Sequence, residues 1–265
     1  MAITPGIMWG AALPPRWHGR DLEAAELFAL LRGLGVEAID VFARHVDHYG
    51  TEALRVALDD SGLRCSCYYV QGDLLAEGEE RIEVERRFAA GVADAASLGS
   101  PLVFTYGTQH AHEGPGALSR YIERLGEKAA DVRAAGMTLV IENAGRMLRS
   151  AGDLLAVATA LGADGPRLCP DTGNFSIWRF DELEAVRRCL PWMAHIHLKD
   201  LSAECVGDQQ GRGVPDVLGR GVTPIAAIVA MLHAAGWEGV AAWEPGPRDE
   251  DGVEAGVAEL MRLVG

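Results

Sequence analysis

The sequence predicts a (β/α)8 barrel, also called a TIM barrel, formed by one domain that spans residues 1–265. Strand-like apolar runs alternate with helical segments at a spacing of roughly 30 residues, which is the pattern of this fold. Several of the runs end in an ionisable residue, as expected where barrel strands open onto a ligand site. No glycine-rich phosphate turn follows the first run, which argues against the competing doubly wound open sheet.

The first half of the chain is expected to supply the first four strands and helices. Leu27 and Leu31 belong to the apolar stripe of the first helix, and Gly35 ends that helix. Gly99 and Gly136 end two later helices in the same way. The expected strands are residues 3–9, 36–42, 64–70 and 101–106, and the expected helices are residues 21–33, 51–61, 79–98 and 117–135, with a loop over 11–19.

Helix starts in the second half of the chain carry capping residues. Ser150 with Asp153 resembles a capping box, as does Asp181 with Glu184. Thr223–Pro224 places an N-cap before a first-turn proline. The expected strands are residues 138–141, 167–170, 193–200 and 240–243, and the expected helices are residues 151–162, 182–189, 224–235 and 252–264.

The composition limits the classes of partner. A formal net charge of −14 and an isoelectric point near 5.0 argue against a nucleic-acid surface, so a small molecule is the expected ligand. The 5 cysteines include no CxxC pair, which disfavours a disulfide framework or a zinc knuckle and indicates the reducing cytoplasm. Neither an export signal nor an apolar run of about 20 residues is present, so we expect no membrane association.

Successive strand ends in the second half carry side chains that bind metals. Glu142, Asp171, His197 and Glu244 end the fifth to eighth predicted strands. Because the C-terminal ends of barrel strands form one face, these side chains are expected to lie close together. Three carboxylates and one imidazole suit Mn2+, Mg2+ or Co2+ better than Zn2+. Any one of these acids alone would be an ordinary loop residue, but their succession predicts a metal site.

Short motifs in the same region resemble the sugar phosphate isomerase/epimerase superfamily, the xylose-isomerase-like TIM barrels. They are Val-Ile-Glu-Asn (140–143), Pro-Asp-Thr-Gly-Asn-Phe (170–175), His-Ile-His-Leu-Lys-Asp (195–200), Gly-Arg-Gly (219–221) and Trp-Glu-Pro (243–245). The resemblance covers most of the chain and is specific in its second half. It implies one divalent ion, usually manganese, and an acid/base pair formed by two of its ligands. The implied ligands are Glu142, Asp171, His197 and Glu244, and the implied acid/base pair is Glu142 and Glu244.

The chemistry that this resemblance implies is proton transfer next to a carbonyl group. A divalent ion polarises the carbonyl of a small polyhydroxy ketone, one glutamate removes the neighbouring proton, and the other returns it. The expected function is therefore an isomerase or epimerase of a small sugar or polyol-ketone that acts through an enediolate. The alternative is a lyase, either a dehydratase of an inosose-like compound or an eliminase of a 3-keto sugar conjugate. A third hypothesis, a non-catalytic barrel that binds a sugar or a partner, conflicts with the intact ligand set.

Further residues are candidates for substrate binding, and each has a structural alternative. Asn174 lies where many relatives carry a histidine, and it would bind substrate or a metal ligand, or serve only its turn. Lys199 shares a strand face with the metal histidine and would stabilise an enolate or form an interior salt bridge. Arg220, in a long loop over 202–221, would meet an anionic group or remain solvated. Trp9 would line the pocket or fill the barrel.

Three other histidines have expected positions in the barrel, and two departures from the family pattern limit the substrate class. His195 is expected to face inward as an interior histidine with satisfied hydrogen bonds, and His110 and His112 follow the fourth strand. The ketose 3-epimerase branch carries a glutamate and an arginine where this chain has Leu148 and Ala203. This difference disfavours free-ketose epimerisation and leaves inosose, hydroxypyruvate or keto-glycoside chemistry open.

Two properties of relatives bear on the assembly and on a nuclease alternative. Endonuclease IV shares the barrel but needs three metals and additional histidines, and Asn174 occupies the position of one of them. The acidic net charge also opposes DNA binding. Because oligomers are common among relatives, a homo-oligomer is expected.

Overall fold

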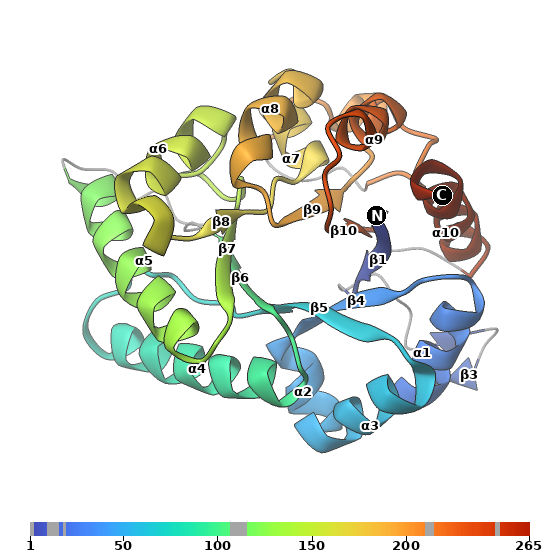
Figure 1. Ribbon diagram of the computed structural model, residues 1–265, viewed down its shortest axis with the longest axis horizontal. Helices are drawn as coiled ribbons and strands as arrows, with labels where there is room; N and C mark the ends of the chain where they lie inside the picture. Colours follow the sequence, from blue (N-terminus) through green and yellow to red (C-terminus); the bar gives the residue numbers. More distant parts are fainter. Residues whose placement is uncertain (1–2, 10–15, 18–19, 107–115, 210–214, 247–249) are drawn as a thin grey trace.

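Eight parallel strands form the centre of the molecule, and helices surround them (Figure 1). The computed structural model describes residues 3–9, 16–17, 20–106, 116–209, 215–246 and 250–265. The prediction of a (β/α)8 barrel is confirmed. The barrel strands are β1 (Thr4–Met8), β4 (Ala38–Phe42), β5 (Arg64–Tyr69), β6 (Leu102–Tyr106), β7 (Thr138–Glu142), β8 (Arg167–Leu168), β9 (His195–Leu198) and β10 (Val240–Trp243).

The barrel closes between β8 and β9. Continuous pairing gives the strand order β8-β7-β6-β5-β4-β1-β10-β9, so β8 and β9 are the two ends of the sheet. Two isolated parallel bridges join these ends, Leu168 to Met193 and Asp171 to His197. The backbone N–H of His197 donates to the carbonyl of Pro170 at 3.0 Å. This seam therefore places two of the predicted metal ligands opposite each other.

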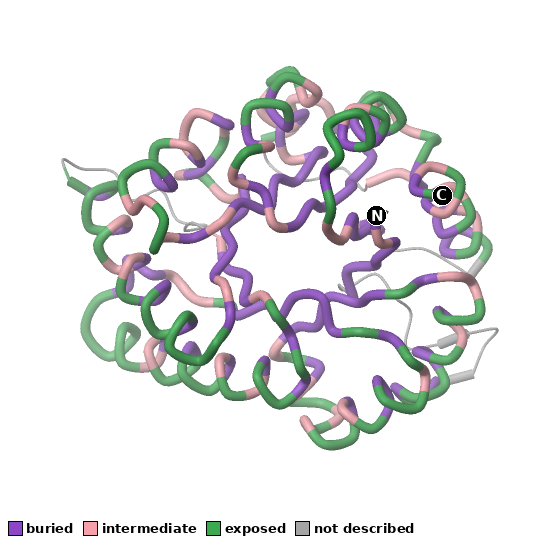
Figure 2. Tube along the Cα trace, viewed as in Figure 1, coloured by how far each residue is buried: buried purple, intermediate pink, exposed green. Residues whose placement is uncertain are grey.

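The helices follow the predicted alternation closely. Figure 2 shows that each buries the side that faces the barrel and exposes the other, as the apolar stripes require. The predicted helix over residues 51–61 has the same bounds in the structure. The main helices are α1 (Ala24–Gly33), α3 (Thr51–Ser61), α4 (Gly78–Ser97), α5 (Ala117–Ala134), α6 (Ala151–Leu161), α8 (Glu182–Cys189), α9 (Ile225–Ala234) and α10 (Glu250–Val264).

The start of the first helix differs from the prediction. Asp21 was expected to open it, but α1 begins at Ala24 because Glu23 and Glu26 form the capping box. Asp21 instead belongs to β3 (Arg20–Asp21), which pairs antiparallel with β2 (Arg16–Trp17). The expected loop over 11–19 therefore contains a short strand, and its other residues lie outside the described part of the chain.

Two short helices were not predicted, and one predicted cap is wrong. The helices α2 (Ala43–Tyr49) and α7 (Thr172–Ile177) follow β4 and β8 directly. Thr223 does not cap α9, because its hydroxyl accepts the backbone N–H of Leu201 at 3.2 Å, and the N-cap residue is Pro224. The predicted caps at Ser150 and Asp181 are confirmed, since both side chains accept a backbone N–H of the first turn.

The buried apolar residues form two groups. The larger lies between the strands and the helices, where the outward side chains of the barrel meet the inner faces of the helices. The smaller fills the barrel itself and lies beside the strand ends that carry the predicted site; it comprises Met8, Phe42, Cys67, Tyr69, Phe104, Val140 and Cys169. Among the described residues, no helix has the length and apolarity that a membrane crossing would require.

Replacing Gly256 of α10 with alanine is expected to lower the free energy of unfolding by about 1–3 kcal/mol, the usual effect of overpacking. A Cβ at Gly256 would lie 2.1 Å from the indole of Trp243, which is fully buried and directly precedes Glu244. Gly33 of α1 is the matched control, because no atom lies within 4 Å of a Cβ placed there. Its alanine variant should gain about 0.5–1 kcal/mol. Urea unfolding measures both, and equal changes would contradict the packing explanation.

Candidate metal centre

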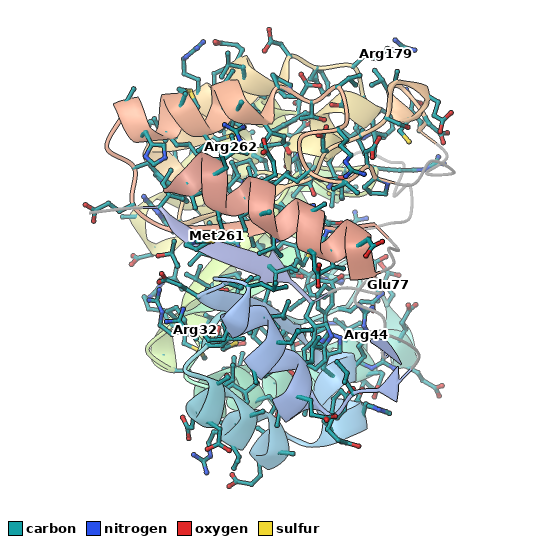
Figure 3. All side chains as sticks on the ribbon, turned by 90° about the vertical axis from the view of Figure 1, so that its right-hand side faces the viewer. Arg32, Arg44, Glu77, Arg179, Met261 and Arg262 are labelled. Carbon is teal, nitrogen blue, oxygen red and sulfur yellow. The ribbon has the colours of Figure 1, made fainter. Side chains whose placement is uncertain are left out.

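The C-terminal ends of the strands open onto one side of the molecule. In Figure 3, Arg44, Glu77 and Arg179, which follow β4, β5 and β8, lie on that side. Arg32, near the end of α1, lies on the opposite side. The predicted ligands belong to the first of these faces, because each lies within three residues of the C-terminal end of its strand.

The structure brings the four predicted metal ligands together. One donor atom each from Glu142, Asp171, His197 and Glu244 can be chosen so that all lie within 4.8 Å of one another. The first three residues are buried, and the side chain of Glu244 is 22% exposed. His197 Nδ1 lies 2.7 Å from Glu142 Oε1. This cluster of one imidazole and three carboxylates could hold a divalent metal ion.

The loop after β8 fixes Asp171 on both sides. The side chain of Asn143 accepts the Asp171 N–H at 2.7 Å and donates to the Asp171 carbonyl at 3.0 Å. Asp171 is also the N-cap of α7, where its Oδ1 accepts the N–H of Asn174 at 2.7 Å. Its second oxygen, Oδ2, is buried and accepts no hydrogen bond of regular geometry from the described residues, but it lies 2.9 Å from Lys199 Nζ. A buried carboxylate oxygen of this kind requires a cation beside it.

The ammonium group of Lys199 lies against the carboxylates of the cluster. Its Nζ lies 2.9 Å from Asp171 Oδ2, 2.7 Å from Glu244 Oε1 and 3.1 Å from Asn174 Oδ1. Burial alone lowers the pKa of Lys199, but the surrounding carboxylates raise it above the usual value. Gly173 makes room for the lysine, because a Cβ there would lie 2.6 Å from Lys199 Cγ. The interior salt bridge, one of the two alternatives for Lys199, is therefore present.

Two of the predicted ligands, Asp171 and His197, have shifted pKa values. The pKa of Asp171 is raised to about 7, mainly by burial and in part by the nearby Glu244, although Lys199 and His197 offset some of the rise. Burial alone lowers the pKa of His197, but its contacts with Cys169, Asp40 and Glu142 raise that pKa well above the usual value. Both groups therefore bind protons near neutral pH in the metal-free protein.

Binding of Mn2+ is expected to weaken as the pH falls through neutrality. A cation binds the ionised carboxylate of Asp171 and the proton-free Nδ1 of His197, and the raised pKa values mean that protons compete for both atoms. Each displaced proton weakens the apparent affinity by about tenfold per pH unit. Titration calorimetry between about pH 6 and pH 8, in buffers of different ionisation enthalpy, measures the affinity and the protons released. A constant affinity over this range would contradict the expectation.

The other predicted site residues differ in whether they contact the cluster. Asn174 contacts Lys199, whereas Trp9 is buried in a stack on His45 with ring centroids 3.8 Å apart. Arg220 is exposed in the loop after β9, and no described contact joins its side chain to the cluster. His195 faces inward as predicted, but only its Nε2 is hydrogen-bonded, because Nδ1 has no partner among the described residues. His110 and His112 lie outside the described residues.

Asp40 is a site residue that sequence reasoning missed. It lies in the middle of β4, is 3% exposed, and places Oδ2 2.9 Å from His195 Nε2 and 3.2 Å from His197 Nε2. Burial would raise its pKa, but the two histidines lower it below the usual range. The sequence did contain a signal for this residue, because Asp40 is a carboxylate inside the apolar run 38–42. A charge buried in such a strand requires partners.

An aromatic pair beside the ligands was also missed. Tyr69 and Tyr106 end β5 and β6, and their rings stack with centroids 5.5 Å apart. Burial raises the pKa of Tyr69 above its usual value, and the neighbouring Tyr106 and Glu142 raise it further. Tyr69 therefore remains a neutral phenol near Glu142. The signal was the end position of both tyrosines in their strands, which is where barrel side chains reach the ligand face.

Comparison with known families agrees with this geometry. The family model described as xylose isomerase-like TIM barrel matches residues 28–263. The chain belongs to this family. No curated protein matches the sequence significantly.

Several solved structures superpose on nearly the whole chain. The 3-keto-D-glucoside 4-epimerase YcjR from E. coli does so with a TM-score of 0.78 at 15% identity, covering 98% of each chain. The probable 3-DHS dehydratase AsbF from Bacillus anthracis has a TM-score of 0.77 at 13% identity, again covering 98% of each chain. A family member from Mycobacterium smegmatis, solved in complex with magnesium, has a TM-score of 0.71 at 20% identity and covers 99% of this chain and 96% of its own. At these identities the likeness shows the fold.

Proposed function

We propose that the chain is a divalent-metal-dependent isomerase or epimerase of a small sugar or polyol-ketone. The observation that carries this proposal is the cluster of Glu142, Asp171, His197 and Glu244 at the C-terminal ends of adjoining strands. The four residues would hold one ion, with Mn2+ preferred and Mg2+, Co2+ or Zn2+ as alternatives. When bound, the ion polarises the substrate carbonyl and makes the neighbouring C–H more acidic.

Proton transfer is assigned to Glu142 and Glu244. One carboxylate removes the proton next to the carbonyl, which produces an enediolate, and the other returns a proton to the same or the adjacent carbon. Return to the opposite face of the same carbon gives epimerisation, and return to the adjacent carbon gives isomerisation. Lys199, held between Asp171 and Glu244, supplies positive charge where negative charge develops on the substrate oxygen.

Three further residues are proposed to bind substrate. Asn174 reaches the cluster through Lys199, and Trp9 lies after β1, whose C-terminal end opens on the same face. Arg220, in the loop that follows β9, is proposed to meet the distal end of the substrate. Tyr69 adds a neutral phenol beside Glu142 that can donate to a substrate hydroxyl.

A lyase is the second candidate, either an inosose-type dehydratase or an eliminase acting on a 3-keto sugar conjugate. The same enediolate would expel a hydroxyl or a sugar from the β-carbon instead of accepting a proton. Leu148 supports this alternative, because it is fully buried and apolar at a position where the ketose 3-epimerase branch carries a glutamate. A dehydratase also occurs among the superposed structures.

The test of the proposed function is proton exchange in deuterated water. The Mn2+-loaded protein is incubated with ketoses, inososes and 3-keto glycosides, and deuterium incorporation is followed by NMR. Incorporation into one substrate supports enolisation, and the product then separates an isomerase from a lyase. A protein that binds no divalent ion, or that binds one and exchanges no proton from any of these compounds, would contradict the proposal.

Location and assembly are part of the same proposal. All 5 cysteines are buried and free, which supports a reducing location such as the cytoplasm. The chain is proposed to act as one domain over residues 1–265, as a homo-oligomer, on a small-molecule substrate rather than on nucleic acid or membrane. Sedimentation velocity measures the oligomeric state.

A further inference from the structure

A fourth carboxylate, that of Asp40, lies beside the ligand cluster and takes no part in the proposed proton transfer. Asp40 Oδ2 contacts both His195 Nε2 and His197 Nε2, at 2.9 and 3.2 Å. Its other oxygen, Oδ1, accepts the hydroxyl of Ser66 at 2.6 Å. All four residues are buried, so these contacts are shielded from water. Three donors therefore converge on one carboxylate at the centre of the barrel.

The chain builds this arrangement with an irregularity in β5. Ile39 pairs with Cys65 and Asp40 pairs with Cys67, so Ser66 is the additional residue of a β-bulge. Cys65 packs between strands and helices, whereas Cys67 packs inside the barrel. Because of the bulge, the side chains of Ser66 and Cys67 both face the barrel interior although the two residues are adjacent in sequence. Ser66 uses this position to donate its hydroxyl to Asp40.

The contacts of Asp40 place a ring proton on Nε2 of His197. A carboxylate accepts hydrogen bonds and donates none, so each histidine presents an N–H at Nε2. In His197, Nε2 therefore carries a proton, and Nδ1, which lies 2.7 Å from Glu142 Oε1, is the ring nitrogen that would give up its proton to bind a cation. His195 Nδ1 has no hydrogen-bond partner among the described residues, in agreement with a single ring proton at Nε2. Asp40 thus holds a proton at Nε2 of His197 and keeps the ring with Nδ1 towards the predicted ligands.

We propose that Asp40 is a positioning residue that fixes the tautomer and the ring orientation of His197, so that Nδ1 is presented to the metal ion. This inference rests on the proposed metal site and adds to it a residue that touches neither ion nor substrate. A carboxylate that holds the far nitrogen of a ligating histidine also makes the near nitrogen a stronger donor. Loss of such a partner typically weakens metal binding by about 10–100-fold.

The test compares Asp40→Asn with the wild-type chain in Mn2+ titrations. The amide keeps the size of the side chain but can donate to Nε2, which permits the wrong tautomer. The expected result is Mn2+ binding weaker by about 10–100-fold, with metal-free folding retained by circular dichroism. Asp153→Asn is the matched control, because Asp153 accepts the N–H groups of Arg149 and Ser150 at the start of α6, away from the cluster. That variant should bind Mn2+ like the wild type.

A spectroscopic measurement separates positioning from general stability. Nitrogen NMR of histidine-labelled, Mg2+-loaded protein should show His197 with its proton at Nε2 in the wild type and a mixture of ring states in Asp40→Asn. Ser66→Ala, which leaves both histidine contacts of Asp40 in place, should change Mn2+ affinity by less than about threefold, the residual effect of a neutral contact.

The outcomes distinguish this inference from the proposed function. If the wild-type chain binds Mn2+ and Asp40→Asn binds it equally well, the inference is wrong and the proposed function stands. If the wild type binds two ions, with Nε2 of His197 as a ligand beside Cys169 and His195, the inference is also wrong. If the wild type binds no divalent ion, both the inference and the proposed function are wrong.

Discussion

Replacing either Glu142 or Glu244 with glutamine should reduce kcat by at least about 10³-fold, within the range that general acid/base catalysis contributes. The amide retains the shape of the side chain but neither accepts the proton of the substrate nor returns one. Because both glutamates are also proposed ligands, metal content must be measured on the same samples. Glu127→Gln, at an exposed position of α5, is the matched control and should leave kcat unchanged.

The two glutamine variants should also differ from each other. The variant that lacks the proton-removing carboxylate should lose deuterium exchange altogether. The variant that lacks the proton-returning carboxylate should still exchange the substrate proton with solvent but form little product. If both variants keep their metal and turn over substrate at the wild-type rate, the assignment of Glu142 and Glu244 is wrong.

Lys199→Met should lower the free energy of unfolding of the metal-free protein by about 3–5 kcal/mol. The lysine is 9% exposed and lies against Asp171 Oδ2 and Glu244 Oε1, so its loss leaves two carboxylates close together without a cation. Added Mn2+ should recover much of the loss, because the ion brings positive charge to the same oxygens. Urea unfolding with a chelator and with Mn2+ measures both values.

A surface ion pair is the control for the lysine variant. Arg262 pairs with Glu259 at 2.6 Å on the outer face of α10 and is labelled in Figure 3. The solvent screens such a pair, so Arg262→Met should leave the unfolding midpoint unchanged. Equal stabilities of Lys199→Met and the wild type in the chelator would show that the lysine does not balance the cluster.

The order of strands and helices followed from the sequence because periodic patterns and caps agree over long segments. Eight apolar runs and the capping residues Ser150 and Asp181 were sufficient for the barrel. The helices α2 and α7 were missed because 7 and 6 residues are too few to display a helical period. Thr223 was assigned wrongly because its hydroxyl has a tertiary partner, Leu201, that a local pattern does not reveal.

The ligand set followed from the sequence because strand position alone brings the ends of parallel strands together. Distances across the barrel do not follow from strand position. Asp40 reaches His195 across 155 positions of sequence, and no local pattern encodes that contact. The sequence likewise left open whether Lys199 forms a salt bridge, since the answer depends on the space that Gly173 provides.

The seam between β8 and β9 gives the barrel a preferred place to open. Two isolated bridges hold it, whereas β9 and β10 share a ladder of 4 residue pairs and β6 and β7 share one of 5. Since Asp171 and His197 stand on opposite sides, an ion held by both would act as a cross-link between the two ends of the sheet. The amide hydrogens of Ala194 and His197, which donate across the seam, should then exchange with solvent more slowly when the ion is bound. Binding of an ion at the site would thus set the rate at which the barrel opens between β8 and β9.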